Sequence, residues 1–219
     1  LTPETGIADE GYRLSIASDR VTIEAADARG AWYGVTTLQQ LLRRRDGRWV
    51  LPLGEVEDQP ANHVRAVMMS LRGCTASPEA VAGLKRAVAM LAELKYNTIY
   101  LEIGEFAQIY RSEQLQFPQL SGVAFSKEQQ REVLDYARSW HLRVVPMAQM
   151  VSHGTWILGN PANQALLENP ADTGWNTVWC WRNPRTKAFA EAFLAETLDF
   201  FQSDEFHVML DEIVYGPFG

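Results

Sequence analysis

The chain is poor in the residues that build disulfide frameworks and metal centres. Its 219 residues include only two cysteines and four histidines. Cys74 and Cys180 lack the short spacing of a zinc-binding pair, and two cysteines form no disulfide framework, so we expect two free thiols. No two histidines show the His-x-x-x-His spacing of a helical metal site. The sequence therefore predicts no bound metal and no other cofactor.

Long runs of one charge and long apolar segments are also missing. The net charge is −7, the pI is near 5.2, and the basic run Arg43-Arg44-Arg45 is expected to be the solvated end of a helix. These features argue against nucleic acid or an anionic membrane as a partner. No segment approaches the roughly 20 apolar residues of a membrane span. The chain starts at Leu1 without a charged-then-apolar leader, which leaves open an exported protein whose leader has been removed.

What the chain does contain is 47% hydrophobic residues, enough for the packed core of a soluble globular protein. Its first part, residues 1–58, predicts a small α+β domain. Apolar and polar residues alternate over residues 12–16 and again over 21–25, which indicates a hairpin. Apolar residues then recur at helical spacing from about Ala31 to Arg44, and Trp49–Leu53 predicts a further strand.

From residue 59 to residue 219, apolar strands alternate with helical segments. The predicted strands are 65–71, 97–103, 142–147 and 206–210. Their continuous apolar character is typical of a parallel sheet that is covered on both faces. Helix starts are indicated by Ser77-Pro78, by Ser126 with Gln129 at the capping-box position, and by Asn183-Pro184. A complete (β/α)8 barrel takes about 250 residues, so these about four β/α units predict the first half of a TIM-type barrel.

Two adjacent carboxylates, Asp211 and Glu212, directly follow the last predicted strand. The carboxyl ends of parallel strands are where α/β folds carry their chemistry. In a semi-enclosed site, two such carboxylates do not both ionise at low cost, so one of them can serve as an acid near neutral pH. Asp-Glu also occurs at residues 9–10 and 204–205, so position distinguishes this copy. The alternative interpretation is a pair of capping or surface acids.

These segments, in their order and spacing, resemble the N-terminal half of glycoside hydrolase family 20, the β-N-acetylhexosaminidases. The matching pieces are Glu10–Ile16 with Gly30–Leu42, Val64–Met69, Leu94–Leu101, Val145–His153, Asn183-Pro184 and Phe206–Glu212. The first two are similar to the small domain that precedes the family's barrel. The others are similar to its first four strand and helix passages.

The resemblance implies a glycosidase that removes terminal β-linked N-acetylhexosamine, GlcNAc or GalNAc, with retention of configuration. Glu212 would protonate the glycosidic oxygen and later act as base, while the sugar's own 2-acetamido oxygen attacks the anomeric carbon. Asp211 would hold the acetamido nitrogen. The implied partner is therefore a carbohydrate that contains N-acetylhexosamine.

Three further site residues follow from the same resemblance. Arg65 matches an arginine that binds sugar hydroxyls, a task suited to a fixed fork of donors. His153 and Glu105 match a histidine and an acid that connect to the catalytic glutamate, which implies a Glu105–His153–Glu212 relay. The alternatives are a salt-bridged arginine at a strand start and a structural loop histidine.

The chain also departs from the family pattern. Ser70 and Gly73 replace an aspartate and an arginine near the first strand, and Met147 and Gln149 replace two acids in the third. The chain is therefore expected to be a divergent member, or else a carbohydrate-binding or assembly module that has lost catalysis.

A long segment between the third and fourth strands is rich in tryptophan: Trp156, Trp175, Trp179 and Trp181. Aromatic faces pack against sugar rings, although tryptophans that only pin the loop to the barrel are the alternative. Half a barrel leaves strand edges and apolar helix faces uncovered. We therefore expect self-association or completion by a missing C-terminal half.

Overall fold

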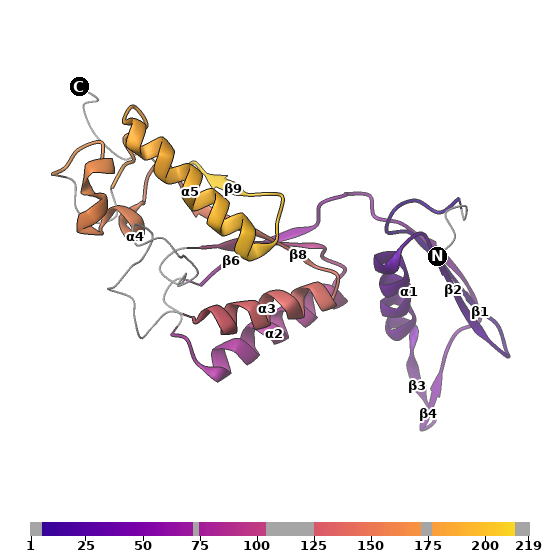
Figure 1. Cartoon of the computed structure of the whole chain (residues 1–219). Helices are drawn as coiled ribbons and strands as arrows, with labels where there is room; N and C mark the ends of the chain where they lie inside the picture. Colours follow the sequence, from indigo (N-terminus) through magenta and orange to yellow (C-terminus); the bar gives the residue numbers. More distant parts are fainter. Residues whose placement is uncertain (1–5, 72–74, 104–124, 172–176, 213–219) are drawn as a thin grey trace. The chain divides into compact units, whose positions relative to one another are not determined.

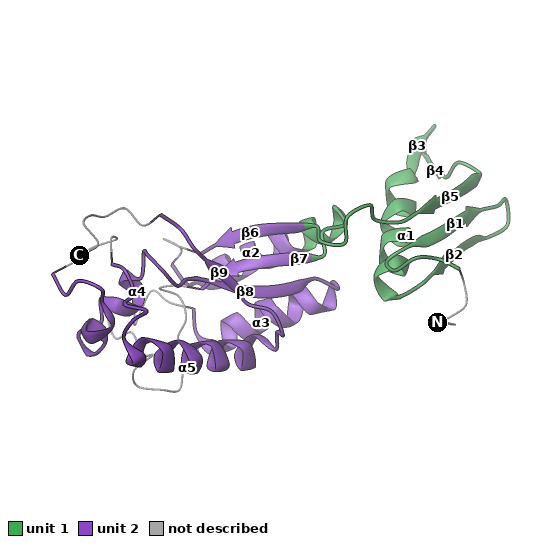
Figure 2. Ribbon diagram, turned by 90° about the horizontal axis from the view of Figure 1, so that it is seen from above, with its two compact units in different colours: residues 1–65, 89–97 green, residues 66–88, 98–219 purple. Residues whose placement is uncertain are grey.

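The structure is a computed structural model that describes residues 6–71, 75–103, 125–171 and 177–212 (Figure 1). It forms two compact units (Figure 2). The first unit contains residues 1–65 and 89–97, and the second contains residues 66–88 and 98–219.

The first unit is built on an antiparallel sheet with strand order β2-β1-β5. Its strands are β1 (Tyr12–Ile16), β2 (Val21–Ala25) and β5 (Gly54–Asp58). Helix α1 (Ala28–Leu41) packs on this sheet, because alternate residues of β1 and Tyr33 of the helix share one apolar cluster. The predicted hairpin of β1 and β2 is confirmed, with Leu14 opposite Ile23.

The segment between α1 and β5 differs from the sequence prediction. The arginine triplet is no helix end: it forms strand β3 (Arg43–Arg45), which pairs with β4 (Arg48–Val50). Asp46 and Gly47 between them have φ angles of 49° and 77°, as the two-residue turn of a tight hairpin requires. All six strand residues are exposed, so no apolar alternation marked them. Strand β5 was missed because Val56 is its one inward-facing apolar residue.

The second unit is a parallel sheet with order β6-β7-β8-β9. Its strands are β6 (Ala66–Ser70), β7 (Thr98–Glu102), β8 (Arg143–Gln149) and β9 (His207–Met209). The long helices that alternate with them are α2 (Pro78–Glu93), α3 (Lys127–Ser139) and α5 (Pro184–Phe201). This order confirms the predicted succession of four parallel strands, each shorter or longer than expected by one or two residues at its ends.

The helix starts are those that the capping residues predict. Ser126 and Gln129 form a reciprocal capping box at the start of α3. Asn183 accepts a hydrogen bond from the Arg185 amide, and Pro184 occupies the first turn of α5. Local chemistry therefore fixes where the covering helices begin.

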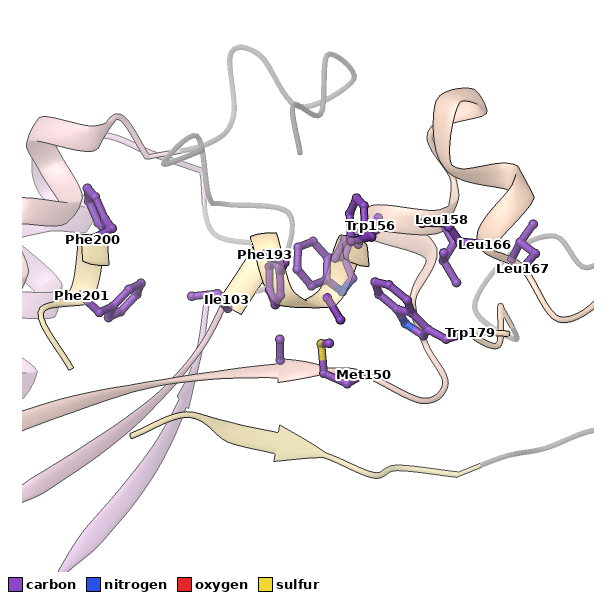
Figure 3. Packing of buried hydrophobic residues seen from close by; sticks show 14 of the residues in the cluster. Ile103, Met150, Trp156, Leu158, Leu166, Leu167, Trp179, Phe193, Phe200 and Phe201 are labelled. Atoms are coloured by element: carbon purple, nitrogen blue, oxygen red, sulfur yellow. The ribbon is translucent and has the colours of Figure 1, made fainter. Parts of the chain in front are cut away.

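The segment between β8 and α5 contains a short helix α4 (Thr155–Leu158) and a 3-10 helix η3 (Pro161–Leu166). Trp156 and Trp179 are buried in the core, and Trp156 packs against Phe193 of α5 (Figure 3). Trp179 packs against Phe189 of the same helix. For these two tryptophans the structure supports the alternative of a pinned loop. Trp181 stacks on Trp179 and is 38% exposed, whereas Trp175 lies outside the described residues.

A buried ion cluster lies in the first unit around Glu10. Its carboxylate accepts hydrogen bonds from Arg65 at 2.5 Å, Arg29 at 2.8 Å and Asn97 at 3.1 Å, and Arg65 also donates to the Tyr33 hydroxyl. Burial raises the pKa of Glu10, but the donors from Arg65, Arg29 and Asn97 outweigh it, so the pKa lies below its usual value. The cluster thus joins residues that are up to 87 positions apart in sequence.

Replacing Glu10 with glutamine is expected to lower the free energy of unfolding by about 2–4 kcal/mol at pH 7, because two guanidinium groups lose their anion. A lowered carboxyl pKa stabilises the fold at pH values above the unfolded value of about 4.3, and this contribution is lost as the pH falls through the folded pKa. The difference between wild type and Glu10→Gln, measured by urea unfolding, should therefore shrink below about pH 4.5.

Glu57→Gln is the matched control. Glu57 pairs with Arg13 at 3.2 Å, but its side chain is 69% exposed, so the loss should stay within about 0.5 kcal/mol. Equal losses in the two variants would contradict the role of the Glu10 cluster.

Candidate active site

Asp211 lies just beyond the carboxyl end of β9, beside the carboxyl end of β8. Gln149, the last residue of β8, pairs in register with Met209. Side chains two residues apart on a strand share a face, so Asp211 continues the face on which Met209 and Gln149 lie. The opposite face carries Ala148, which packs in the helix-covered core. The strand register therefore places the candidate site on the face of the sheet opposite the helix-covered core.

Asp211 lies among polar groups of β8, of the turn after it and of its own neighbour in the chain. Gln149 Nε2 donates to Asp211 Oδ2 at 3.0 Å, and the Glu212 amide donates to Oδ1 at 2.9 Å. Ser152 Oγ donates to the Asp211 carbonyl oxygen at 2.9 Å, and His153 Nε2 lies 3.9 Å from Oδ2. Each carboxylate oxygen thus has its own donor, and a further hydrogen bond holds the main chain.

His153 belongs to a tight turn after β8. Its φ angle is 50°, an uncommon conformation for a residue with a side chain. Main-chain hydrogen bonds from Gly154 to Thr177 and from Trp179 to Val151 tie this turn to the tryptophan-rich segment. The tryptophan-rich segment therefore helps to hold the turn that carries the histidine.

Two members of the expected relay, His153 and Glu212, lie among the described residues. His153 faces Asp211, and Glu212 follows Asp211 in the chain and is exposed. Glu105 lies outside the described residues, so the Glu105–His153–Glu212 relay stays a prediction. Gln149, which sequence reasoning noted as a replaced acid, turns out to contact Asp211. The strand register could have predicted this contact: Gln149 pairs with Met209, and Asp211 lies two residues after Met209.

Arg65 belongs to the first unit, where it directly precedes β6 in the chain. Besides Glu10, its guanidinium donates to the main-chain oxygens of Lys95 and Asn62, each at 2.8 Å. The ion pair with Glu10 agrees with the alternative of a salt-bridged arginine at a strand start, and the sugar contact of Arg65 stays a prediction.

Other polar residues lie lower on the same face of the sheet. Glu102 is buried and pairs in register with Met147, which in turn pairs with His207. The His207 ring packs edge-on against Tyr100, with centroids 5.2 Å apart. Within the described parts of the chain, no three His, Cys, Asp or Glu residues gather as a metal site would require, and no helix is long and apolar enough to cross a bilayer.

Comparisons with known proteins agree on one family. The family model described as "Glycosyl hydrolase family 20, domain 2" matches residues 1–59, and "Glycosyl hydrolase family 20, catalytic domain" matches residues 79–219. Beta-hexosaminidase subunit A1 of Dictyostelium discoideum is 25% identical over 98% of this chain and 41% of its own length. The chain thus spans less than half of that relative.

Solved structures show the same similarity. The N-acetyl-beta-hexosaminidase of Streptomyces plicatus aligns with a TM-score of 0.78 and 25% identity, over 95% of this chain and 46% of that one. The GH20 beta-N-acetylhexosaminidase of Streptomyces coelicolor A3(2) aligns with a TM-score of 0.77 and 26% identity, over 94% and 46%. These matches confirm the predicted fold, a small α+β domain followed by the first half of a TIM-type barrel.

Gly154, beside His153, has no room for a side chain. A Cβ there would lie 2.7 Å from Trp179 Nε1 and 2.8 Å from Leu158 Cδ1, and both neighbours are buried. Gly154→Ala should therefore lower the free energy of unfolding by about 1–3 kcal/mol, as measured by urea unfolding. In the control Gly83→Ala the nearest atom, on Arg86, is 3.7 Å away, so that helical substitution should be neutral or stabilising. Equal destabilisation would contradict close packing at Gly154.

Proposed function

Since the chain belongs to glycoside hydrolase family 20, we propose that its protein is a β-N-acetylhexosaminidase that removes terminal β-linked N-acetylhexosamine from carbohydrates. The observation that carries the proposal is the placement of the Asp211-Glu212 pair. It lies at the carboxyl end of a parallel strand, with the Asp211 carboxylate fixed through both of its oxygens.

The reaction begins with a proton transfer. Glu212 in its protonated form gives its proton to the glycosidic oxygen, and the bond between that oxygen and the anomeric carbon breaks. The carbonyl oxygen of the substrate's 2-acetamido group forms a new bond to the same carbon from the opposite face. No nucleophile of the protein is required.

Asp211 assists this attack. Its carboxylate accepts the acetamido N–H, which orients the carbonyl oxygen and stabilises the positive charge that develops on the amide. Glu212, now ionised, then takes a proton from a water molecule that attacks the anomeric carbon, and the acetamido group is released. Two inversions leave the configuration retained.

Apolar residues at the two edges of the sheet suggest what completes the site. Met68 on β6 and Val208 on β9 are exposed, as is Leu210 after β9. We propose that further strands and helices of a complete barrel cover these residues, with self-association as the alternative. Activity is therefore tested in a protein that carries a complete catalytic domain.

Glu212→Gln is expected to lower kcat/KM for N,N′-diacetylchitobiose by about 10²- to 10⁴-fold, because the general acid is lost. For the 4-nitrophenyl glycosides of N-acetylglucosamine and N-acetylgalactosamine the loss should be smaller, because nitrophenolate leaves without full protonation. The matched control is Glu205→Gln, which removes the exposed partner of Arg143 and should leave kcat/KM unchanged.

Each other outcome has a distinct meaning. Equal activity of Glu212→Gln and wild type on diacetylchitobiose would exclude Glu212 as the acid. If the folded wild type binds N-acetylglucosamine but hydrolyses neither kind of substrate, the proposed enzymatic function is wrong. The alternative, a carbohydrate-binding module that has lost catalysis, would then hold.

A further inference from the structure

Gln149 is a buried side chain whose one described polar contact is the Asp211 carboxylate. Gln149 is 2% exposed, and its Nε2 donates to Asp211 Oδ2 at 3.0 Å. Its Oε1 is buried and finds no hydrogen-bond partner in the part of the chain that the structure describes. A buried amide oxygen without a partner costs about 1–3 kcal/mol. Among the described residues, the donor end of this amide is therefore used and its acceptor end is not.

The orientation of this amide follows from electrostatics. If the amide were turned round, Oε1 would face Asp211 Oδ2, and two acceptors would meet without a proton between them. The Nε2 group therefore points at the carboxylate. Because Glu212 N holds Oδ1 at the same time, the two donors fix the plane of the carboxylate rather than a single oxygen.

We propose that Gln149 is a positioning residue, which holds the Asp211 carboxylate in the plane in which it accepts the acetamido N–H of the substrate. This inference rests on the proposed function. The neutral amide does what an acidic residue at this position does only while protonated, namely donate to Asp211. Glutamine in place of the acid at residue 149 therefore changes the pH range over which Asp211 is held in position, whereas the role of Asp211 stays the same.

Several titratable groups lie near Asp211 and have to be considered in a test that varies the pH. His153 faces Asp211 from the turn after β8, and Glu212 follows it in the chain, while Glu102 and His207 lie lower on the same face. In Gln149→Glu, two carboxyl groups would lie about 3 Å apart and would share a proton at low pH. Protonated, the new glutamic acid donates as glutamine does; ionised, it repels Asp211.

The experiment is a double-mutant cycle in the protein with a complete catalytic domain, using 4-nitrophenyl N-acetyl-β-glucosaminide. Gln149→Met keeps the length of the side chain and removes the donor, and it should lower kcat about 10- to 100-fold with little change in KM. In an Asp211→Ala background the same change should lower kcat less than about twofold, because nothing is left to position. Gln149→Glu should retain activity at about pH 5 and lose about tenfold by pH 8 relative to wild type.

Gln130→Met is the matched control. Gln130 donates through Nε2 to the Phe125 main-chain oxygen on another part of the unit, so its replacement should leave kcat unchanged. Thermal unfolding of every variant separates loss of positioning from loss of folding.

Three results would overturn the role of Gln149 in an active wild type. In the first, Gln149→Met lowers kcat by the same factor in the wild type and in the Asp211→Ala background. In the second, the kcat of Gln149→Met stays within twofold of the wild type. In the third, the pH profile of Gln149→Glu follows that of the wild type. A silent wild type overturns the proposed function itself, and this inference with it.

Discussion

The candidate site depends first on the register of two short parallel strands. β8 and β9 pair through only three residue pairs, and the Met150 amide extends the ladder to the Met209 oxygen. A shift of one residue would turn Asp211 to the opposite face of the sheet. The apolar face formed by Ala148 and Met150 opposes such a shift, because both residues pack in the core. Core packing on one face thus sets the geometry of the polar groups on the other.

The same core also holds the turn that contains His153. Trp156 packs against Phe193 of α5, the helix that leads into β9 (Figure 3). Trp179 packs against Phe189 of the same helix. Trp179 also binds the main chain of Val151, just before the turn. One apolar cluster therefore positions both sides of the site: the strand that delivers Asp211 and the turn that delivers Ser152 and His153. The two buried tryptophans therefore contribute to the candidate site indirectly, through the residues that they hold in place.

How much the sequence predicts depends on the range of the interaction. The parallel strands, the first hairpin and the capped helix starts were predictable, because apolar runs and capping residues act within a few positions. The hairpin at Arg43–Val50 was wrongly predicted as a helix end, because exposed arginines carry no pattern and the Asp46-Gly47 turn signal went unused. The contact of Gln149 with Asp211 spans 62 positions, and that of Arg65 with Glu10 spans 55. Such contacts depend on strand register and chain topology, which no local pattern encodes.

Two Asp-Glu pairs in this chain show why surroundings, not dipeptides, decide what a carboxylate does. Glu10 of the first pair is enclosed by two arginines and an asparagine, which keep it ionised and shield it from water, so it stabilises the fold. Asp211 of the later pair is held by an amide and by the main-chain N–H of its own neighbour, and its side chain remains 49% exposed. Neutral donors fix the direction of this carboxylate without burying it. An amide approaching from solvent would therefore meet an oriented acceptor, which is the property that the proposed substrate-assisted hydrolysis requires of Asp211 and that the arginine-enclosed Glu10 lacks.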